Sequence, residues 1–164
     1  MIELKEFDEI VSTNFEYLFN MGFTKVQVER LHAMLYVRFI KNDLLVRIEY
    51  SIKNDHLNAI IIKNPLNAGD NRDTPENSVA LFHLMSKYQP NFDFNKDYEM
   101  LMPKEIGMLH SVKEIAQLFG EYAIDILLGK KWESWGDITG YKSPKSPEIN
   151  IYFDGGWIWH KPKE

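Results

Sequence analysis

Cysteine is absent from the 164-residue sequence, so the chain can form neither a disulfide nor a thiolate metal site. A chain without cysteine suits a reducing compartment, and we therefore expect a cytoplasmic protein. The N-terminal segment is acidic from the start and lacks the apolar stretch of a signal peptide. No apolar run approaches the ~18 residues of a transmembrane helix, so we expect no membrane segment.

Sequence motifs of catalysis and metal binding are also missing. None of the five histidines lies three to five residues from another, as a helical metal pair would require. The chain has no Gly-x-Ser-x-Gly elbow and no glycine-rich phosphate loop. Residues 93–99 imitate the start of a calcium loop, but Tyr98 replaces the required Gly and Lys104 replaces the required Glu. We therefore expect no catalytic residue, no cofactor and no metal.

The charged residues are unevenly distributed. Net charge is −5, which argues against a nucleic-acid partner. Residues 1–20 carry five acidic side chains and a single basic one, Lys5, whereas the tail from Tyr141 is weakly basic. This acidity either serves solubility or attracts a cationic partner.

Alternation of apolar and polar residues predicts an antiparallel meander with one covered face. The expected strands are Phe23–Arg30, Ala33–Ile40, Leu44–Ser51 and Leu57–Lys63. Apolar residues recur every three or four positions over 4–20 and 109–128, which predicts two amphipathic helices. The fold class is therefore α+β, a β-meander with helices packed on one face, and we assign residues 1–140 to this domain.

The segment Thr74-Pro75-Glu76 predicts the start of a further helix that ends at Pro90. Thr would cap it, Pro suits the first turn, and Glu lies near the positive end of the helix dipole. Asp70 and Asp73 precede this segment, and we expect them to bind backbone N–H groups. The alternative is a carboxylate pair for acid–base chemistry.

Residues 141–164 form a C-terminal linker and β-hairpin. Asp154-Gly155-Gly156 is typical of a tight turn, and the flanking runs are rich in aromatic and β-branched residues. An isolated hairpin is marginally stable in water, so it needs a docking surface. That surface is its own domain, a partner protein, or a second copy of the chain in a homodimer.

Four segments together resemble a known family. They are LFNMGF at 18–23, YVRF at 36–39, VRIEY at 46–50 and AIDILLGKKW at 123–132. Their order resembles small bacterial α+β proteins, some of which are immunity proteins of toxin–immunity systems. The resemblance covers residues 7–63 and 109–138. It implies tight binding to a cognate toxin and supplies no catalytic residue.

We therefore expect a non-catalytic binding protein that neutralises a toxin, for example a cationic nuclease. Acidic residues would steer association, and tryptophans would anchor the interface, because Trp combines a large area with a polar group. The candidate partner-binding residues are Glu9, Glu16, Asp93, Asp97, Glu99, Trp132, Trp135, Trp157 and Trp159. The alternative is a small-molecule-binding domain or enzyme with a pocket between sheet and helices. Its candidate lining residues are Tyr50, His56, Asp70 and His83.

Overall fold

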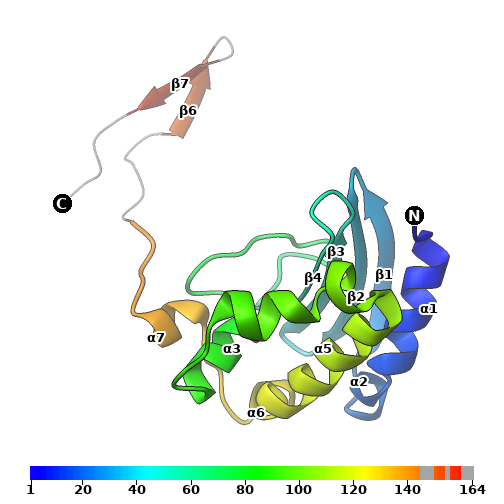
Figure 1. Ribbon diagram of the computed structural model, residues 1–164. Helices are drawn as coiled ribbons and strands as arrows, with labels where there is room; N and C mark the ends of the chain where they lie inside the picture. Colours follow the sequence, from blue (N-terminus) through cyan, green and yellow to red (C-terminus); the bar gives the residue numbers. More distant parts are fainter. Residues whose placement is uncertain (145–149, 154–155, 160–164) are drawn as a thin grey trace.

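A five-stranded antiparallel sheet of order β1-β2-β3-β4-β5 forms the centre of the molecule (Figure 1). The computed structural model describes residues 1–144 in full and residues 150–153 and 156–159 as backbone. The strands are β1 (Thr24–Leu31), β2 (Met34–Lys41), β3 (Leu44–Ser51), β4 (His56–Lys63) and β5 (Ser78–Ala80). The first four are consecutive neighbours in the sheet, so the structure confirms the predicted α+β class and the antiparallel meander.

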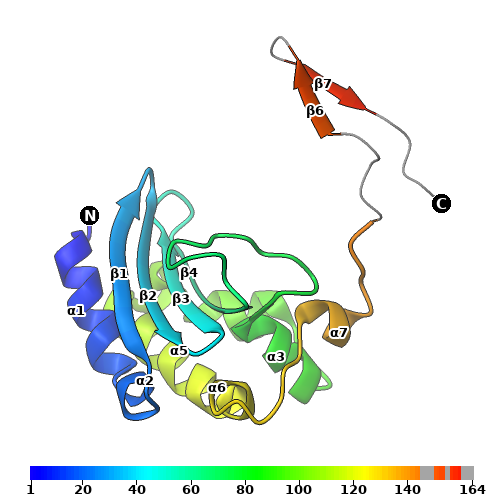
Figure 2. The same cartoon turned by 180° about the vertical axis from the view of Figure 1, so that it is seen from behind.

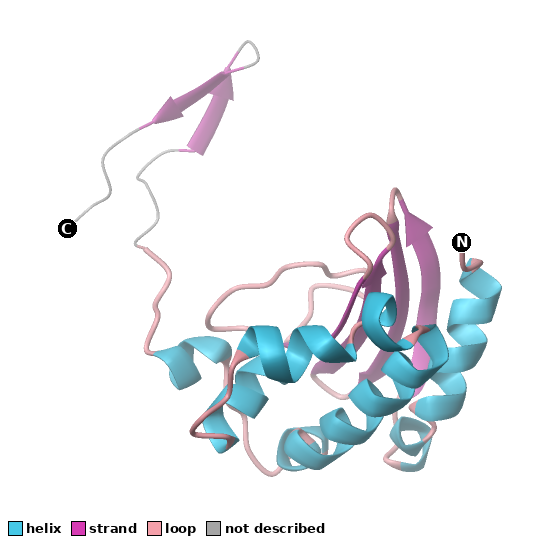
Figure 3. Ribbon diagram, in the orientation of Figure 1, coloured by secondary structure: helices cyan, strands magenta, loops and turns pink. Residues whose placement is uncertain are grey.

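Seven α-helical segments lie within residues 1–144 (Figure 3). They are α1 (Leu4–Asn14), α2 (Tyr17–Asn20), α3 (Leu81–Tyr88), α4 (Pro103–Ile106), α5 (Met108–Tyr122), α6 (Ile124–Leu127) and α7 (Trp135–Thr139). A π-helical turn, η1 (Phe94–Tyr98), and a 3-10 turn, η2 (Glu99–Leu101), precede α4. Each of the two long helices expected from the sequence is divided in two, at residues 15–16 and at Ala123.

Helices α1 and α5 cover one face of the sheet (Figure 1). Leu35, Val37 and Phe39 of β2 point into this layer and are completely buried, in one cluster with Phe7 and Phe119. Burial of a large apolar side chain contributes ~1.5–3 kcal/mol, so this layer is the main source of stability.

The opposite face of the sheet is also covered, which the alternating pattern did not predict. A loop of residues 64–77, between β4 and β5, crosses in front of β3 and β4 (Figure 2). Arg38 and Arg47 lie on this face and are 0% and 3% exposed. The alternation of residues along a strand predicts which side chains share a face of the sheet. It does not predict whether a loop from elsewhere in the chain covers the polar face.

The helix expected to start at Thr74 does not form there. The Asn77 side-chain oxygen accepts hydrogen bonds from Thr74 N and Thr74 Oγ1, and Asn77 N donates one to Thr74 Oγ1. These three bonds close a turn. Ser78–Ala80 then pairs with Ile60–Ile62 as strand β5, and the helix begins only at Leu81. Pairing with a central strand outweighed the local helix-start signal.

Strands β6 (Asn150–Phe153) and β7 (Gly156–Trp159) pair antiparallel near the C-terminus. Residues 145–149, the Asp154-Gly155 turn and residues 160–164 lie outside the described part of the chain. The C-terminal hairpin and its docking therefore both stay predictions.

Candidate protein-binding site

A surface groove of about 730 Å³ lies beside α7. Its walls come from two segments of the chain that are far apart in the sequence, residues 75–76 and residues 132–143. The lining residues are Pro75, Glu76, Trp132, Ser134, Gly136, Asp137, Gly140, Tyr141, Lys142 and Ser143.

Local sequence signals fix the short helix that forms one wall of this groove. Ser134 Oγ accepts a hydrogen bond from Asp137 N at 3.1 Å, and Asp137 Oδ2 accepts one from Ser134 N at 3.0 Å. This reciprocal pair is a capping box. Gly140 ends the helix in a left-handed conformation with φ of 78°, which favours glycine.

Close backbone contact joins α7 to the loop before β5. Gly136 N donates a hydrogen bond to the Pro75 carbonyl oxygen at 2.7 Å. A Cβ atom on Gly136 would lie 2.6 Å from that same oxygen, so only glycine allows this approach. This contact fixes the positions of the two walls of the groove relative to each other.

Three aromatic rings stack next to the groove. His83 of α3 stacks on Trp135 with ring centroids 5.5 Å apart and an interplanar angle of 14°. Trp135 stacks in turn on Tyr141 at 5.3 Å and 20°. Trp135 Nε1 donates a hydrogen bond to Asp73 Oδ1 at 3.2 Å, so the central ring is oriented from its edge as well. We call His83, Trp135 and Tyr141 the aromatic stack.

The His83 ring is held in the neutral form. Burial lowers its pKa to about 4, although the nearby Asp73 carboxylate acts in the opposite direction. Its Nδ1 accepts a hydrogen bond from Ala80 N at 3.0 Å, which requires that nitrogen to be unprotonated. His83 therefore serves as a flat, uncharged support for Trp135.

Two carboxylates line the groove, and a third contacts the aromatic stack. Glu76 accepts hydrogen bonds from Ser143 N at 2.9 Å and Ser143 Oγ at 2.8 Å, which lower its pKa. Asp137 lies in the groove and Asp73 contacts the stack, whereas Lys142 is the one basic residue among the lining residues. The site is therefore aromatic with an acidic rim, and it suits a cationic group.

The structure brings together only some of the predicted partner-binding residues. Trp132 lines the groove and packs on the core, and Trp135 centres the aromatic stack. Glu9 lies on α1 and Glu16 directly before α2, and α1 and α7 are at opposite ends of the molecule in Figure 1.

The other predicted residues lie elsewhere. Asp93 and Asp97 accept backbone N–H bonds within their own turn, and Glu99 pairs with His56 and Lys104. Trp157 and Trp159 belong to β7, and their side chains lie outside the described part of the chain.

The four residues expected to line a small-molecule pocket each have separate partners. Tyr50 Oη donates to the Asp55 carboxylate, and His56 contacts Glu99 at 3.0 Å. Asp70 accepts backbone bonds from Leu66 and Arg72, as expected of it, and His83 belongs to the aromatic stack. They do not form one common polar centre.

Sequence reasoning missed Tyr141, Glu76 and Asp73. The capping-box spacing Ser134-x-x-Asp137, followed by Gly140, was a usable signal for a short helix that carries Trp135. No sequence signal linked this helix to residues 73–76, some 60 positions earlier.

Among residues 1–144, no group of three or more His, Asp or Glu side chains is placed to hold a metal ion. In the same part of the chain, every helix is too short or too polar to cross a membrane. Comparison with family models, curated proteins and solved structures finds no match to this chain.

Proposed function

We propose that this protein is a non-catalytic, cytoplasmic binding protein that neutralises a cationic protein partner, in the manner of a toxin immunity protein. The contact surface is the groove beside α7 together with the aromatic stack. The observation that carries this proposal is the stack itself, three partly exposed rings held in place before any partner is present.

Pre-ordered aromatic rings suit an interface for a physical reason. Ordering a flexible side chain on binding costs ~0.5–1.5 kcal/mol. Trp135 is already fixed by two ring contacts and by its bond to Asp73, so little of this cost remains. Tryptophan and tyrosine are also the residue types most often found at the energetic centre of interfaces.

The acidic rim favours a basic partner. Glu76 and Asp137 lie in the groove, and their charges would speed association with a cationic surface and oppose an anionic one. A lysine or arginine of the partner would also interact favourably with the exposed part of an aromatic ring.

The C-terminal hairpin extends this surface in our proposal. The chain leaves the described body at Ser143, which lines the groove, and Trp157 and Trp159 follow within twenty residues. The competing role is strand exchange in a homodimer. Solution mass decides between them: a monomeric full-length chain supports a role in partner binding, and a dimer that disappears when the chain ends at Pro144 supports exchange.

Growth rescue tests the function. The product of a gene adjacent to this one should be toxic when expressed alone, and co-expression of this protein should restore growth. Trp135→Ala and Tyr141→Ala should abolish rescue, whereas Leu109→Ala should preserve it. Leu109 is the matched control, because it is an exposed apolar residue (62%) on α5 outside the groove.

The outcomes separate the two parts of the proposal. Absence of any toxic neighbour, together with absence of rescue, would contradict the immunity role. Rescue that survives both aromatic substitutions would leave the role standing and refute the groove as its surface. Calorimetry on the complex should show affinity that weakens as salt concentration rises.

A further inference from the structure

Two arginines lie side by side on the loop-covered face of the sheet. Arg38 of β2 and Arg47 of β3 are direct cross-strand partners, and both are at least 97% buried. Like charges directly opposite one another destabilise a sheet, and removing a charge from water adds a further cost. This arrangement therefore calls for strong acceptors around the two guanidinium groups.

The sheet supplies only part of those acceptors. Arg38 Nη1 donates to Glu29 Oε1 at 3.0 Å and to Gln27 Oε1 at 3.1 Å. Arg47 Nε donates to Glu49 Oε2 at 3.0 Å. Arg38 Nε is completely buried and has no hydrogen-bond partner among the described residues, so one charged donor is left unused there.

A register irregularity in β1, between Lys25 and Gln27, lies beside this cluster. Gln27 is the residue that follows the irregularity, and its side-chain oxygen accepts a hydrogen bond from Arg38 Nη1. Bulges of this kind occur preferentially next to functional sites, where they redirect a side chain.

The loop over the pair supplies the remaining acceptors as neutral oxygens. Asn71 Oδ1 accepts from Arg38 Nη2 at 2.6 Å, and the Asp70 carbonyl oxygen accepts from Arg47 Nη1 at 3.2 Å. Both oxygens come from adjacent residues of one segment. Guanidinium groups form strong, frequently bidentate hydrogen bonds with phosphate oxygens, so an oxyanion could compete with the loop for these two donors.

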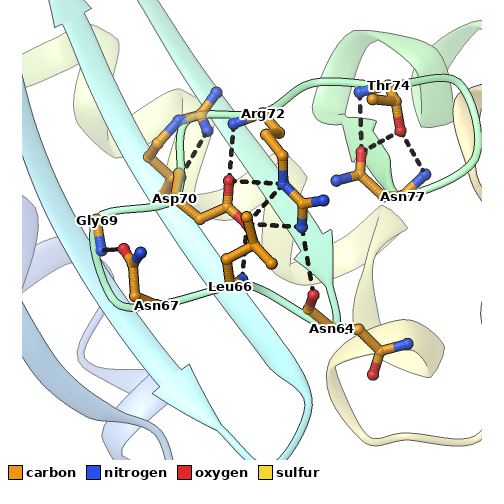
Figure 4. A network of polar contacts seen from close by, with 9 residues as sticks. Asn64, Leu66, Asn67, Gly69, Asp70, Arg72, Thr74 and Asn77 are labelled. Atoms are coloured by element: carbon orange, nitrogen blue, oxygen red, sulfur yellow. Dashed lines mark hydrogen bonds and ion pairs between the residues drawn. The ribbon is translucent and has the colours of Figure 1, made fainter.

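Residues 64–73 of this loop are held mainly by their own contacts (Figure 4). The Asp70 carboxylate accepts from Leu66 N and Arg72 N, both at 2.9 Å, and pairs with the Arg72 side chain. Gly69 N donates to Asn67 Oδ1 at 2.8 Å. Residues 65–72 can therefore lift from the sheet with these internal bonds intact. The ends of the segment stay fixed, because Asn64 N is bonded to the Asp43 carbonyl oxygen and Asp73 to Ser78 and Trp135. Loops of this length without helix or strand are commonly functional.

We propose that Arg38 and Arg47 form a binding site for a phosphate group, and that the loop of residues 64–73 covers this site and competes with the ligand. A phosphate would take the Arg38 Nη2 and Arg47 Nη1 donors from the loop oxygens and engage the unused Arg38 Nε. Planar guanidinium groups are well matched to phosphate oxygens. This site is separate from the aromatic groove and does not depend on the proposed partner.

Nuclear magnetic resonance with the full-length protein tests the proposal. The probe is inorganic phosphate, added at constant ionic strength against sodium chloride, with a phosphomonoester as a second arm. Signals of the Arg38 and Arg47 side chains and of the residue 64–73 amides should shift and saturate in the millimolar range. Tighter binding of the ester would identify a phosphorylated small molecule, and equal binding would identify free phosphate.

Two substitutions give opposite expectations. Asn71→Ala removes the competing amide from an exposed loop position, so phosphate should bind about tenfold more tightly. Arg47→Lys removes the planar fork, so binding should weaken at least about tenfold. Arg30→Lys, at an exposed arginine of β1, is the matched control and should leave affinity unchanged.

Two results would overturn the proposal. One is the absence of saturable shifts at Arg38 and Arg47, or identical shifts with chloride. The other is an Asn71→Ala protein that binds phosphate no more tightly than the native chain, because the loop would then not compete. Since Asn71 is a surface loop residue, this second test remains valid even where Arg47→Lys disturbs folding.

Discussion

The pKa of His83 reports directly on the aromatic stack. Burial lowers it from the ordinary value of 6.5 to about 4, and Trp135 is one of the rings that cover the imidazole. Trp135→Ala opens that side to water while Phe82, 4.3 Å from the His83 ring, stays in place. We therefore expect the substitution to raise the pKa by roughly one unit, which is ~1.4 kcal/mol.

The same pKa makes stability depend on pH in a defined direction. The folded protein favours neutral His83, so its contribution is complete above pH 6.5 and is lost as the pH falls toward 4. A fully buried ring would lose ~3 kcal/mol over this window. Because His83 is only partly buried, solvent screening reduces the expected loss to ~1–2 kcal/mol.

Histidine ring signals followed by NMR from well below pH 4 to above pH 6.5 provide the measurement. Asp73→Asn should lower the His83 pKa further, because the Asp73 carboxylate favours the charged ring. Trp132→Ala is the control, since that ring does not stack on His83. A native pKa near 6.5, or one that Trp135→Ala leaves unchanged, would refute the reasoning.

Three further predictions concern stability, each read from denaturant or thermal unfolding. Burial alone would raise the pKa of Asp70, but its bonds to Arg72 and Leu66 outweigh burial and lower it to about 2. Stability from Asp70 should therefore be complete above pH 3.8 and fall toward pH 2, and Asp70→Asn should remove this dependence. Gly136→Ala should cost ~1–3 kcal/mol, because its Cβ would meet a backbone oxygen at 2.6 Å. Our proposal assigns the tail beyond Pro144 to partner binding, so a chain ending at Pro144, which keeps the bond between Ser143 and Glu76, should unfold at the same temperature as the full chain.

Each of these three predictions has an outcome that contradicts it. An Asp70→Asn protein that keeps the acid-dependent loss would assign that loss to another carboxylate. A Gly136→Ala protein as stable as the native chain would show that α7 can move away from residue 75. A lower unfolding temperature for the shortened chain would mean that the tail beyond Pro144 stabilises the body.

Local patterns in the sequence were sufficient to predict the first four strands of the sheet. Leu35, Val37 and Phe39 alternate with polar residues, and the Lys41-Asn42-Asp43 turn suits a tight reversal, so strand positions and the antiparallel order followed from neighbouring residues alone. Asn42 indeed adopts a positive φ of 53°. Both signals are short-range, because strand alternation and turn chemistry act over a few residues.

Equally clear local signals gave wrong predictions where a contact with residues far away in the sequence determined the structure. Thr74-Pro75-Glu76 fits a helix start, yet pairing of residues 78–80 with β4 made it a turn. Arg38 and Arg47 fit an exposed sheet face, yet a loop from the far side of β4 buries them. The free energy of such long-range contacts exceeds the few tenths of a kcal/mol by which local preferences differ.

The candidate binding site also has some features that follow from the sequence and others that depend on tertiary contacts. The sequence by itself determined that all four tryptophans lie in the last third of the chain and that aromatic anchors were to be sought there. Only the tertiary structure decided that Trp135 stands between His83 and Tyr141, beside carboxylates some 60 residues earlier in the chain. The physical reason is that a binding surface is a property of packed neighbours, and the contact between Gly136 and Pro75 that creates it has no local signature.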